Sequence, residues 1–191
     1  FFALLIYLFG KSFLAIRLAG LLLVTITAFY TYRLAKQSSS KMVALPLALL
    51  CVILQSLFGS LQGVMSEHLA MACLTPALWF MTRKKTNSWQ WLYIGLLVGA
   101  ALMVKLNLAY VGLLLGLTII WVTFNHQKKT AFIAPTLLYG AGILLVFAFC
   151  LLPYALDDLL PLWWKSVIEA PLAYAGARTY GPIKLLSYLL P

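Results

Sequence analysis

Six long apolar runs, separated by short polar or basic connections, dominate this sequence. They cover approximately residues 13–35, 42–63, 68–81, 89–104, 108–124 and 130–156. A helix needs roughly 20 apolar residues to cross the ~30 Å hydrocarbon layer of a bilayer, and most of these runs approach that length. Every backbone polar group in lipid needs an internal partner, which helices provide. We therefore predict an all-α fold, a polytopic transmembrane bundle of about six spans with partial spans at its ends.

The composition excludes an ordinary soluble domain. The chain is 64% hydrophobic and only 9% charged, whereas soluble domains carry about 25% charged residues. Fourteen Lys and Arg residues against four Asp and Glu residues give a net charge of +10. These cations form short clusters between apolar runs, a pattern typical of loops that set membrane orientation. The pattern argues against nucleic-acid binding.

The basic clusters also predict which side of the membrane each connection faces. Alternate connections hold most of the cations, namely Arg33, Lys36 and Lys41, then residues 83–85, then residues 128–129. Cytoplasmic loops carry an excess of Lys and Arg, so we place these connections in the cytoplasm. The opposite set comprises the start of the first run, the connection at Glu67, the interruption at Lys105 and segment 157–182. We expect this set to face outside.

The remaining segments fit a single transmembrane domain over residues 1–191. Residues 1–12 are predicted to be an interfacial or truncated segment, and 157–182 an outer interfacial loop rich in aromatic and charged residues. Residues 183–191 read as the start of a further span. The chain begins with Phe1 and its last apolar run stops at Pro191. We expect the sequence to be an internal piece of a longer membrane protein.

Charged groups at membrane depth are the main candidates for function, because each costs ~2.5–3.5 kcal/mol to insert. Three places qualify: Arg17, the pair Glu67 and His68, and Lys105. They come from different runs, but all are predicted to lie toward the outer face. Two cations near one carboxylate suit a phosphate-bearing lipid headgroup. The alternative is that Arg17 and Lys105 snorkel to the interface, while Glu67 marks a helix start.

Other polar or reactive groups give weaker signals. Glu67 and His68 could contribute to a metal site but lack an evident third ligand, so we assign no metal and no cofactor, although a divalent ion is possible. The adjacent Asp157 and Asp158 are more typical of an interface. The three cysteines lie inside apolar runs without metal-ligand spacing. Three glycine pairs with small-xxx-small spacing predict close helix packing, at Gly59/Gly63, Gly95/Gly99 and Gly112/Gly116.

Several stretches together resemble one enzyme family. The stretch 8–18 (LFGKSFLAIRL) is similar to the "lfG-s-x-x-x-x-RL" motif of family 39 glycosyltransferases, and 30–35 (YTYRLA) resembles their "l-y-x-l-a-r" helix. Ser66 and Glu67 precede an apolar helix and Arg83, as an acidic residue does in that family. The stretch 91–105 (WLYIGLLVGAALMVK) resembles "w-x-l-x-G-l-x-x-G-l-a-x-l-x-K". These polytopic GT-C enzymes include dolichyl-phosphate-mannose protein mannosyltransferases and bacterial aminoarabinose transferases.

The resemblance, which covers about residues 8–116, implies a glycosyltransferase. Such an enzyme moves a sugar from a polyprenyl-phosphate donor to a protein or lipid hydroxyl on the outer face of the membrane. By position, Lys105 and Arg17 would contact the donor phosphate, and Glu67 and His68 would form part of the site wall. The family's catalytic Asp would precede Phe1, so no catalytic base is assigned and this piece is expected to be inactive alone. A bacterial plasma membrane fits the cation bias.

Two other functional classes remain open from the residues themselves. A transporter or flippase for a lipid phosphate would use the same cations without needing a base, although no inverted repeat is evident. In a structural membrane subunit the charged trio would be incidental. An acidic residue in an outer loop upstream of Phe1 would favour the enzyme over both.

Overall fold

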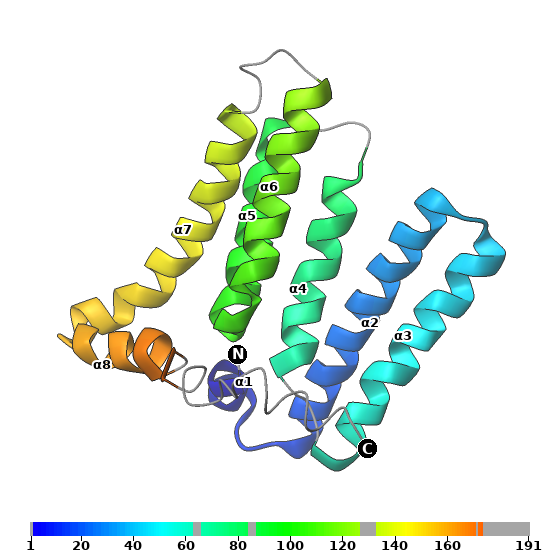
Figure 1. The fold of residues 1–191 in the computed structure, drawn as a ribbon. Coiled ribbons are helices and arrows are strands. Elements are labelled where there is room, and N and C mark those ends of the chain that lie inside the picture. Colours follow the sequence, from blue (N-terminus) through cyan, green and yellow to red (C-terminus); the bar gives the residue numbers. More distant parts are fainter. Residues whose placement is uncertain (1, 63–65, 84–86, 127–132, 171, 174–191) are drawn as a thin grey trace, which may run out of the picture. The chain divides into compact units, whose positions relative to one another are not determined.

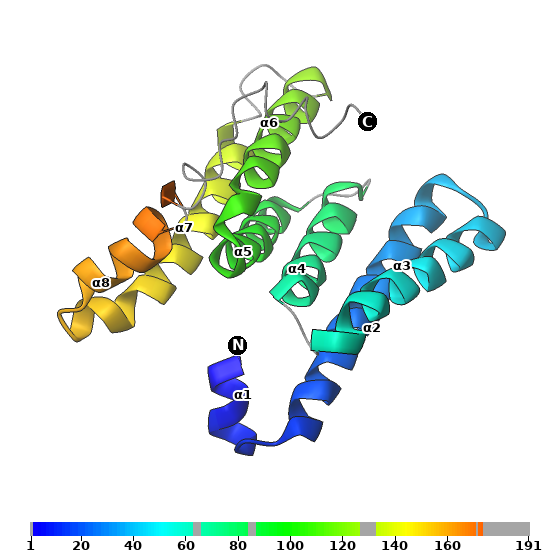
Figure 2. The same cartoon turned by 60° about the horizontal axis from the view of Figure 1, so that its bottom comes forward.

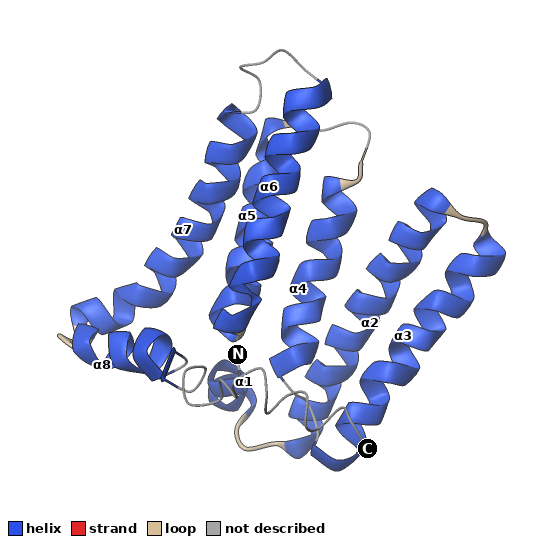
Figure 3. Cartoon of the chain, in the orientation of Figure 1, coloured by secondary structure: helices blue, strands red, loops and turns tan. Residues whose placement is uncertain are grey.

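The computed structural model describes residues 2–62, 66–83, 87–126, 133–170 and 172–173, and its described residues form helices without a strand (Figure 3). The elements are α1 (Phe2–Phe9), α2 (Phe13–Ser38), α3 (Lys41–Gln62), α4 (Ser66–Met81), α5 (Ser88–Val104), the 3-10 turn η1 (Leu106–Leu108), α6 (Ala109–His126), α7 (Ile133–Leu156), α8 (Leu160–Trp164) and the π-helical turn η2 (Lys165–Glu169). The predicted all-α class is confirmed for this part of the chain.

Three of the helical segments are long and apolar enough to cross a membrane by length and composition. They are Phe13–Ser38, Leu106–Phe124 and Ile133–Leu156. Two shorter apolar helices, Lys41–Leu57 and Ser88–Val104, accompany them. Helix α4 has 16 residues, which corresponds to about 24 Å at 1.5 Å per residue. The membrane character is thus confirmed at this level, while the count of six spans stays a prediction.

Element boundaries follow the sequence closely, although α2 continues to Ser38, beyond the predicted end at residue 35. Residues Ser66 and Glu67, expected to belong to a connection, form the first turn of α4. Carboxylates favour the positive end of the helix dipole, which explains why Glu67 can open a helix. At the other end of the chain, Gly10 has a φ of +67°, a conformation that suits glycine and allows the turn between α1 and α2. The Ser12 side chain then accepts a hydrogen bond from the Ala15 N–H at 3.3 Å.

The chain divides into two compact units, residues Phe1–Phe147 and Ala148–Pro191. In the first unit, α2 to α6 run in alternate directions (Figure 1). Helices α2 and α3 lie side by side, as a second view also shows (Figure 2), and α4 packs against both α2 and α5. The second unit contains the end of α7 followed by α8 and η2. Between α7 and α8, Asp158 takes a φ of +56°.

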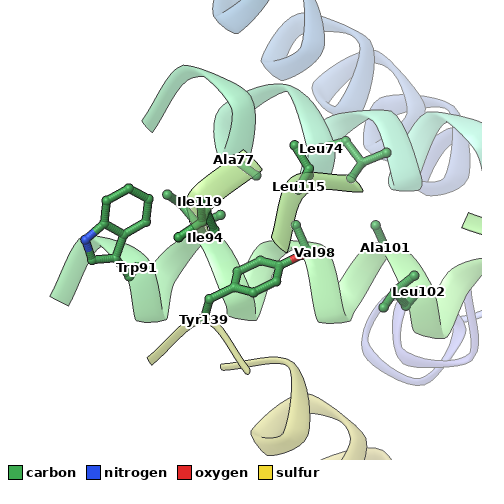
Figure 4. Close-up of a cluster of buried hydrophobic side chains, with 10 residues drawn as sticks. All are labelled: Leu74, Ala77, Trp91, Ile94, Val98, Ala101, Leu102, Leu115, Ile119 and Tyr139. Atoms are coloured by element: carbon green, nitrogen blue, oxygen red, sulfur yellow. The ribbon is translucent and has the colours of Figure 1, made fainter. Parts of the chain in front are cut away.

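The core of the first unit is built around α5 (Figure 4). Ile94, Val98 and Ala101 are fully buried along one side of this helix. They pack with residues of α4, α6 and α7, including Leu74, Ala77, Leu115, Ile119 and Tyr139. By contrast, Leu113, Leu117 and Trp121 on α6 are all more than 60% exposed. Apolar residues on an outer face are expected where lipid is the solvent.

Glycines allow the closest contact in this core. A Cβ atom on Gly142 would lie 2.5 Å from the Leu92 carbonyl oxygen and 2.7 Å from the Leu96 nitrogen, so only glycine fits between α5 and α7. Facing it, a Cβ on Gly95 would overlap the Tyr139 carbonyl. The predicted packing role of Gly95/Gly99 is therefore confirmed, and Gly142 adds a contact that the sequence analysis missed. Gly59 and Gly63 fall outside the described side chains.

A hydrogen bond adds to this contact between helices. The buried Tyr139 hydroxyl donates to the Gly112 carbonyl oxygen of α6 at 2.7 Å. Gly116, one turn further, leaves room for the Tyr139 ring, whose Cε1 would lie 3.3 Å from a Cβ at that position. A phenol in an apolar core needs a partner for its hydroxyl, and the buried carbonyl of Gly112 provides it. Tyr139 therefore joins α7 to α6.

We predict that Gly142→Ala destabilises the protein by about 1–3 kcal/mol, because backbone atoms of α5 would have to move to admit the methyl group. The free energy of unfolding in a detergent titration measures this loss. Gly140→Ala is the matched control, since a Cβ at Gly140 meets nothing within 4 Å and alanine favours the helix by up to ~1 kcal/mol. Equal destabilisation by both substitutions would contradict the packing argument.

Candidate functional site

An ion pair joins two helix ends that meet at one end of the first unit. The Lys105 ammonium contacts Oε1 of Glu67, as both a salt bridge and a hydrogen bond. Glu67 lies in the first turn of α4, and Lys105 directly follows α5. A carboxylate at a helix N-terminus and a cation at a helix C-terminus are each favoured by the local dipole. Both charges are thus stabilised by their helices as well as by each other.

The backbone at Lys105 explains how its side chain reaches α4. Its φ of −146° and ψ of 101° are extended, so α5 ends here while the Lys105 N–H still donates to the Ala101 carbonyl at 3.0 Å. The 3-10 turn η1 follows, and the Leu108 N–H donates to the Lys105 carbonyl at 3.0 Å. The break between α5 and α6 therefore holds a lysine at a fixed place. Its side chain is 35% exposed, so it remains accessible.

Glu67 is held as a carboxylate. The hydrogen bond from Lys105 is the main cause that lowers the pKa of Glu67 below its ordinary value of 4.5, and the Ser66 hydroxyl, 3.1 Å from Oε2, adds to the effect. The Glu67 side chain is 52% exposed and lies outside the candidate membrane spans. Glu67 therefore places a negative charge beside the Lys105 ammonium at neutral pH.

His68 has a different environment from its neighbour. Its side chain is only 6% exposed, and its Nε2 lies 3.1 Å from the backbone carbonyl oxygen of Gln55 in α3. A carbonyl oxygen only accepts, so this contact places the proton on Nε2. His68 thereby ties the start of α4 to α3. Among the described residues no third His, Cys, Asp or Glu joins Glu67 and His68 in a potential metal cluster.

An apolar cavity of about 410 Å³ lies beside these residues, between α3 and α4. Leucines of α3 and Met71 of α4 form most of its walls, while Glu67, His68 and Gln55 supply its polar groups. The buried Gln55 Oε1 has no hydrogen-bond partner among the described residues, and its Nε2 contacts Cys51 Sγ at 3.6 Å. The cavity thus combines hydrocarbon walls with an acceptor that is open to a hydrogen-bond donor.

The structure does not bring every predicted site residue into this group. Arg17 lies in the second turn of α2. The start of α2, the start of α4 and the end of α5 lie at the same end of the first unit (Figure 1). The guanidinium carbon of Arg17 is 4.5 Å from the centre of the Phe13 ring. In the described part of the chain, the ion pair of Glu67 is with Lys105 and not with Arg17. The trio therefore consists of one pair and one separate cation.

Sequence reasoning missed Gln55. A single amide inside the apolar run 42–63 was a usable signal, since a polar side chain at membrane depth needs a partner. The segment 157–182 belongs to the second unit, where Asp157 and Asp158 are exposed. Residues 171 and 174–182 of this segment lie outside the described residues.

We predict that Lys105 and Glu67 are energetically coupled. A double-mutant cycle of Lys105→Ala and Glu67→Ala, read as free energies of unfolding, is expected to give an interaction of about 0.2–1 kcal/mol, because the pair is partly exposed and screened. A second cycle that combines Lys11→Ala with Glu67→Ala is the control, and we expect it to give no interaction energy. Strictly additive effects of Lys105 and Glu67 would refute the pairing.

The contribution of this pair is also expected to depend on pH. The pKa of Glu67 is lowered by folding, so the stabilisation is complete above the ordinary carboxyl value of 4.5 and is lost as the pH falls through the lower folded-state value. The stability difference between the wild type and Glu67→Gln should therefore vanish in acid. Unfolding titrations between pH 7 and pH 3 measure it. A difference that persists unchanged at pH 3 would exclude ionised Glu67 as its source.

The candidate residues lie in a part of the chain that matches a known protein family. Residues 1–154 match the family model described as dolichyl-phosphate-mannose-protein mannosyltransferase, and this range contains Arg17, Glu67, His68 and Lys105. Neither the curated proteins nor the solved structures gave a significant match. The family match covers most of the 191 residues and confirms the resemblance seen in the motifs. The chain belongs to the dolichyl-phosphate-mannose-protein mannosyltransferase family.

Proposed function

We propose that this protein transfers a sugar from a polyprenyl-phosphate donor to a hydroxyl acceptor at the extracytoplasmic face of a membrane. Family membership supplies the reaction class. The observation that carries the proposal for these residues is the accessible Lys105 ammonium, held by Glu67 at the end of α5. A cation fixed at a helix break is suited to stabilise charge that develops on a leaving phosphate.

The reaction requires a balanced exchange of bonds. The acceptor oxygen forms a bond to the anomeric carbon, and the bond from that carbon to the phosphate oxygen breaks. The electron pair leaves with the lipid phosphate, and a base takes the hydroxyl proton. The attack inverts the anomeric carbon. No residue in the described part of the chain is assigned as this base.

Lys105 can serve the phosphate without losing Glu67. An ammonium group has three N–H donors, and one of them suffices for the carboxylate. The other two are free to donate to phosphate oxygens. In this arrangement Glu67 is a positioning residue that orients the Lys105 ammonium. Arg17, at the same end of the first unit, would supply a second cation for the donor, and its planar guanidinium suits phosphate oxygens.

The cavity between α3 and α4 supports a substrate that carries a hydrocarbon chain. Its leucine-rich walls can accommodate an apolar chain. Glu67, His68 and Gln55 can contact the polar group that such a substrate also carries. Pockets of ~300–1,000 Å³ with few polar groups are typical of small-molecule sites. Glu67 and His68 are therefore proposed as part of the site wall. We propose a multi-pass location with about six spans, in a bacterial plasma membrane.

The test uses the longest reading frame that contains these residues, expressed in membranes with radiolabelled polyprenyl-phosphate mannose. Lys105→Ala is expected to reduce kcat for sugar transfer about 100-fold, as loss of one donor to a developing oxyanion does. Lys41→Ala, which removes the same charge at the opposite end of the helices, is the matched control and should retain activity.

Lys105→Arg separates charge from shape, because it keeps the cation but changes its geometry. We expect it to restore part of the lost activity. Full activity of Lys105→Ala would remove Lys105 from the donor site. Absence of transfer by the wild-type protein, with mannose or another lipid-linked sugar, would overturn the transferase and favour a lipid-phosphate transporter.

A further inference from the structure

A second charged cavity lies at the opposite ends of α2 and α4 from the Lys105–Glu67 pair. It has a volume of about 770 Å³ and is lined by Arg33, Leu34, Lys36, Gln37, Ser38, Trp79, Thr82 and Arg83. Three of these residues are cations. In residues 1–147, the unit that contains the cavity, Glu67 is the only Asp or Glu in the sequence, and it is paired with Lys105. This cavity therefore carries positive charge without a carboxylate from its own unit.

Trp79 holds two of the cations in place. The guanidinium carbons of Arg33 and Arg83 each lie 4.9 Å from the centre of the Trp79 ring. Arg33 also lies 5.7 Å from the Phe29 ring. Contacts of this kind contribute ~0.5–1 kcal/mol at exposed sites. They bring two positive groups within about one Debye length of each other, a distance at which salt screens their repulsion only in part.

The two helices that carry these cations are also fixed to each other. The Thr82 hydroxyl lies 2.7 Å from Oε1 of Gln37, which joins the end of α4 to the last turn of α2. It also lies 3.0 Å from the Trp79 carbonyl oxygen. The lining of the cavity is thus organised before any ligand arrives. A preorganised cluster loses less entropy on binding than free lysine or arginine side chains would.

Helix dipoles do not neutralise this charge. Each helix C-terminus contributes about half a negative charge, so the ends of α2 and α4 together offset roughly one of the three cations. About two positive charges remain for a ligand. The excess of Lys and Arg in cytoplasmic loops would account for basic residues at this end of the helices. That excess does not explain why two of these cations contact the same tryptophan and line the same cavity.

The depth of the cavity indicates where its ligand comes from. Helix α2 has 26 residues and is therefore about 39 Å long, whereas the hydrocarbon layer is ~30 Å thick. About six residues exceed that thickness, and the five cavity residues on α2 all lie within its last six positions, 33–38. Trp79 is a residue type that favours the headgroup region. Basic pockets between membrane helices at this level suit anionic lipid headgroups.

We propose that the cavity formed by Arg33, Lys36, Trp79 and Arg83 binds the phosphate of an anionic phospholipid from the leaflet that faces the basic connections. The guanidinium groups donate to the phosphate oxygens, and the lipid relieves their mutual repulsion. Leu34 supplies an apolar wall. This site is independent of the proposed sugar transfer, because it uses other residues at the other end of the helices.

The test measures lipid retention by the protein purified in detergent, using native mass spectrometry with added phosphatidylglycerol or phosphatidylcholine. We expect phosphatidylglycerol to bind at least about fivefold more tightly, and Arg33→Gln/Arg83→Gln to weaken it at least about tenfold, since each cation near a membrane surface contributes roughly fivefold. The control Lys11→Gln/Lys41→Gln removes the same charge outside the cavity and should retain the preference.

Inorganic phosphate distinguishes a lipid from a soluble anion. Millimolar phosphate should leave phosphatidylglycerol binding unchanged; full competition by it would assign the site to a soluble phosphate compound and overturn the lipid. Equal retention of both lipids, or equal losses in the two double variants, would overturn the site itself.

A charge-conserving variant keeps the proposal testable if the glutamine variant does not fold. Arg33→Lys/Arg83→Lys retains both cations but loses the planar groups that stack on Trp79. We expect an intermediate, about fivefold weaker retention of phosphatidylglycerol. Retention equal to that of the wild type would refute the role of the Trp79 cluster in organising the site.

Discussion

Close contact between helix backbones is the constraint on which the first unit depends. Lipid tails are as apolar as leucine, so burial alone gives membrane helices little reason to associate. Dispersion and interhelical hydrogen bonds replace that driving force, and both require atoms to come near. Gly95 and Gly142 provide this at the α5–α7 contact, where backbone meets backbone. Tyr139 then uses the same closeness to reach a carbonyl on α6.

Charge is distributed unequally over this unit, and each end is suited to a different interaction. At one end, Lys105 is balanced by Glu67, the single acidic residue within 1–147. At the other end, Arg33 and Arg83 share an aromatic ring instead of a carboxylate. A balanced pair holds a donor in a defined orientation at little net charge. An unbalanced cluster attracts anions. The same helices, α2 and α4, link the two arrangements.

The sequence was sufficient to predict the helices and their alternation, because apolar runs leave the backbone no alternative in lipid. It also identified Lys105 and Glu67, since charged residues interrupting such runs are few. It could not predict that these two would pair while Arg17 turned to Phe13, because the choice depends on which helix ends meet. Gly142 and Gln55 were missed for a related reason. The role of each residue depends on the helix or cavity that it faces, and residue spacing within one helix does not show that.

The interruption at Lys105 has a mechanical consequence. The residue ends α5, precedes α6 and reaches the first turn of α4, so three helices share one joint. An anion that accepts hydrogen bonds from the two remaining N–H donors of this ammonium leaves the contact with Glu67 in place. The start of α4, which His68 also ties to α3, would then be linked through Lys105 to the bound anion. A ligand bound to Lys105 would therefore affect helices that it does not contact.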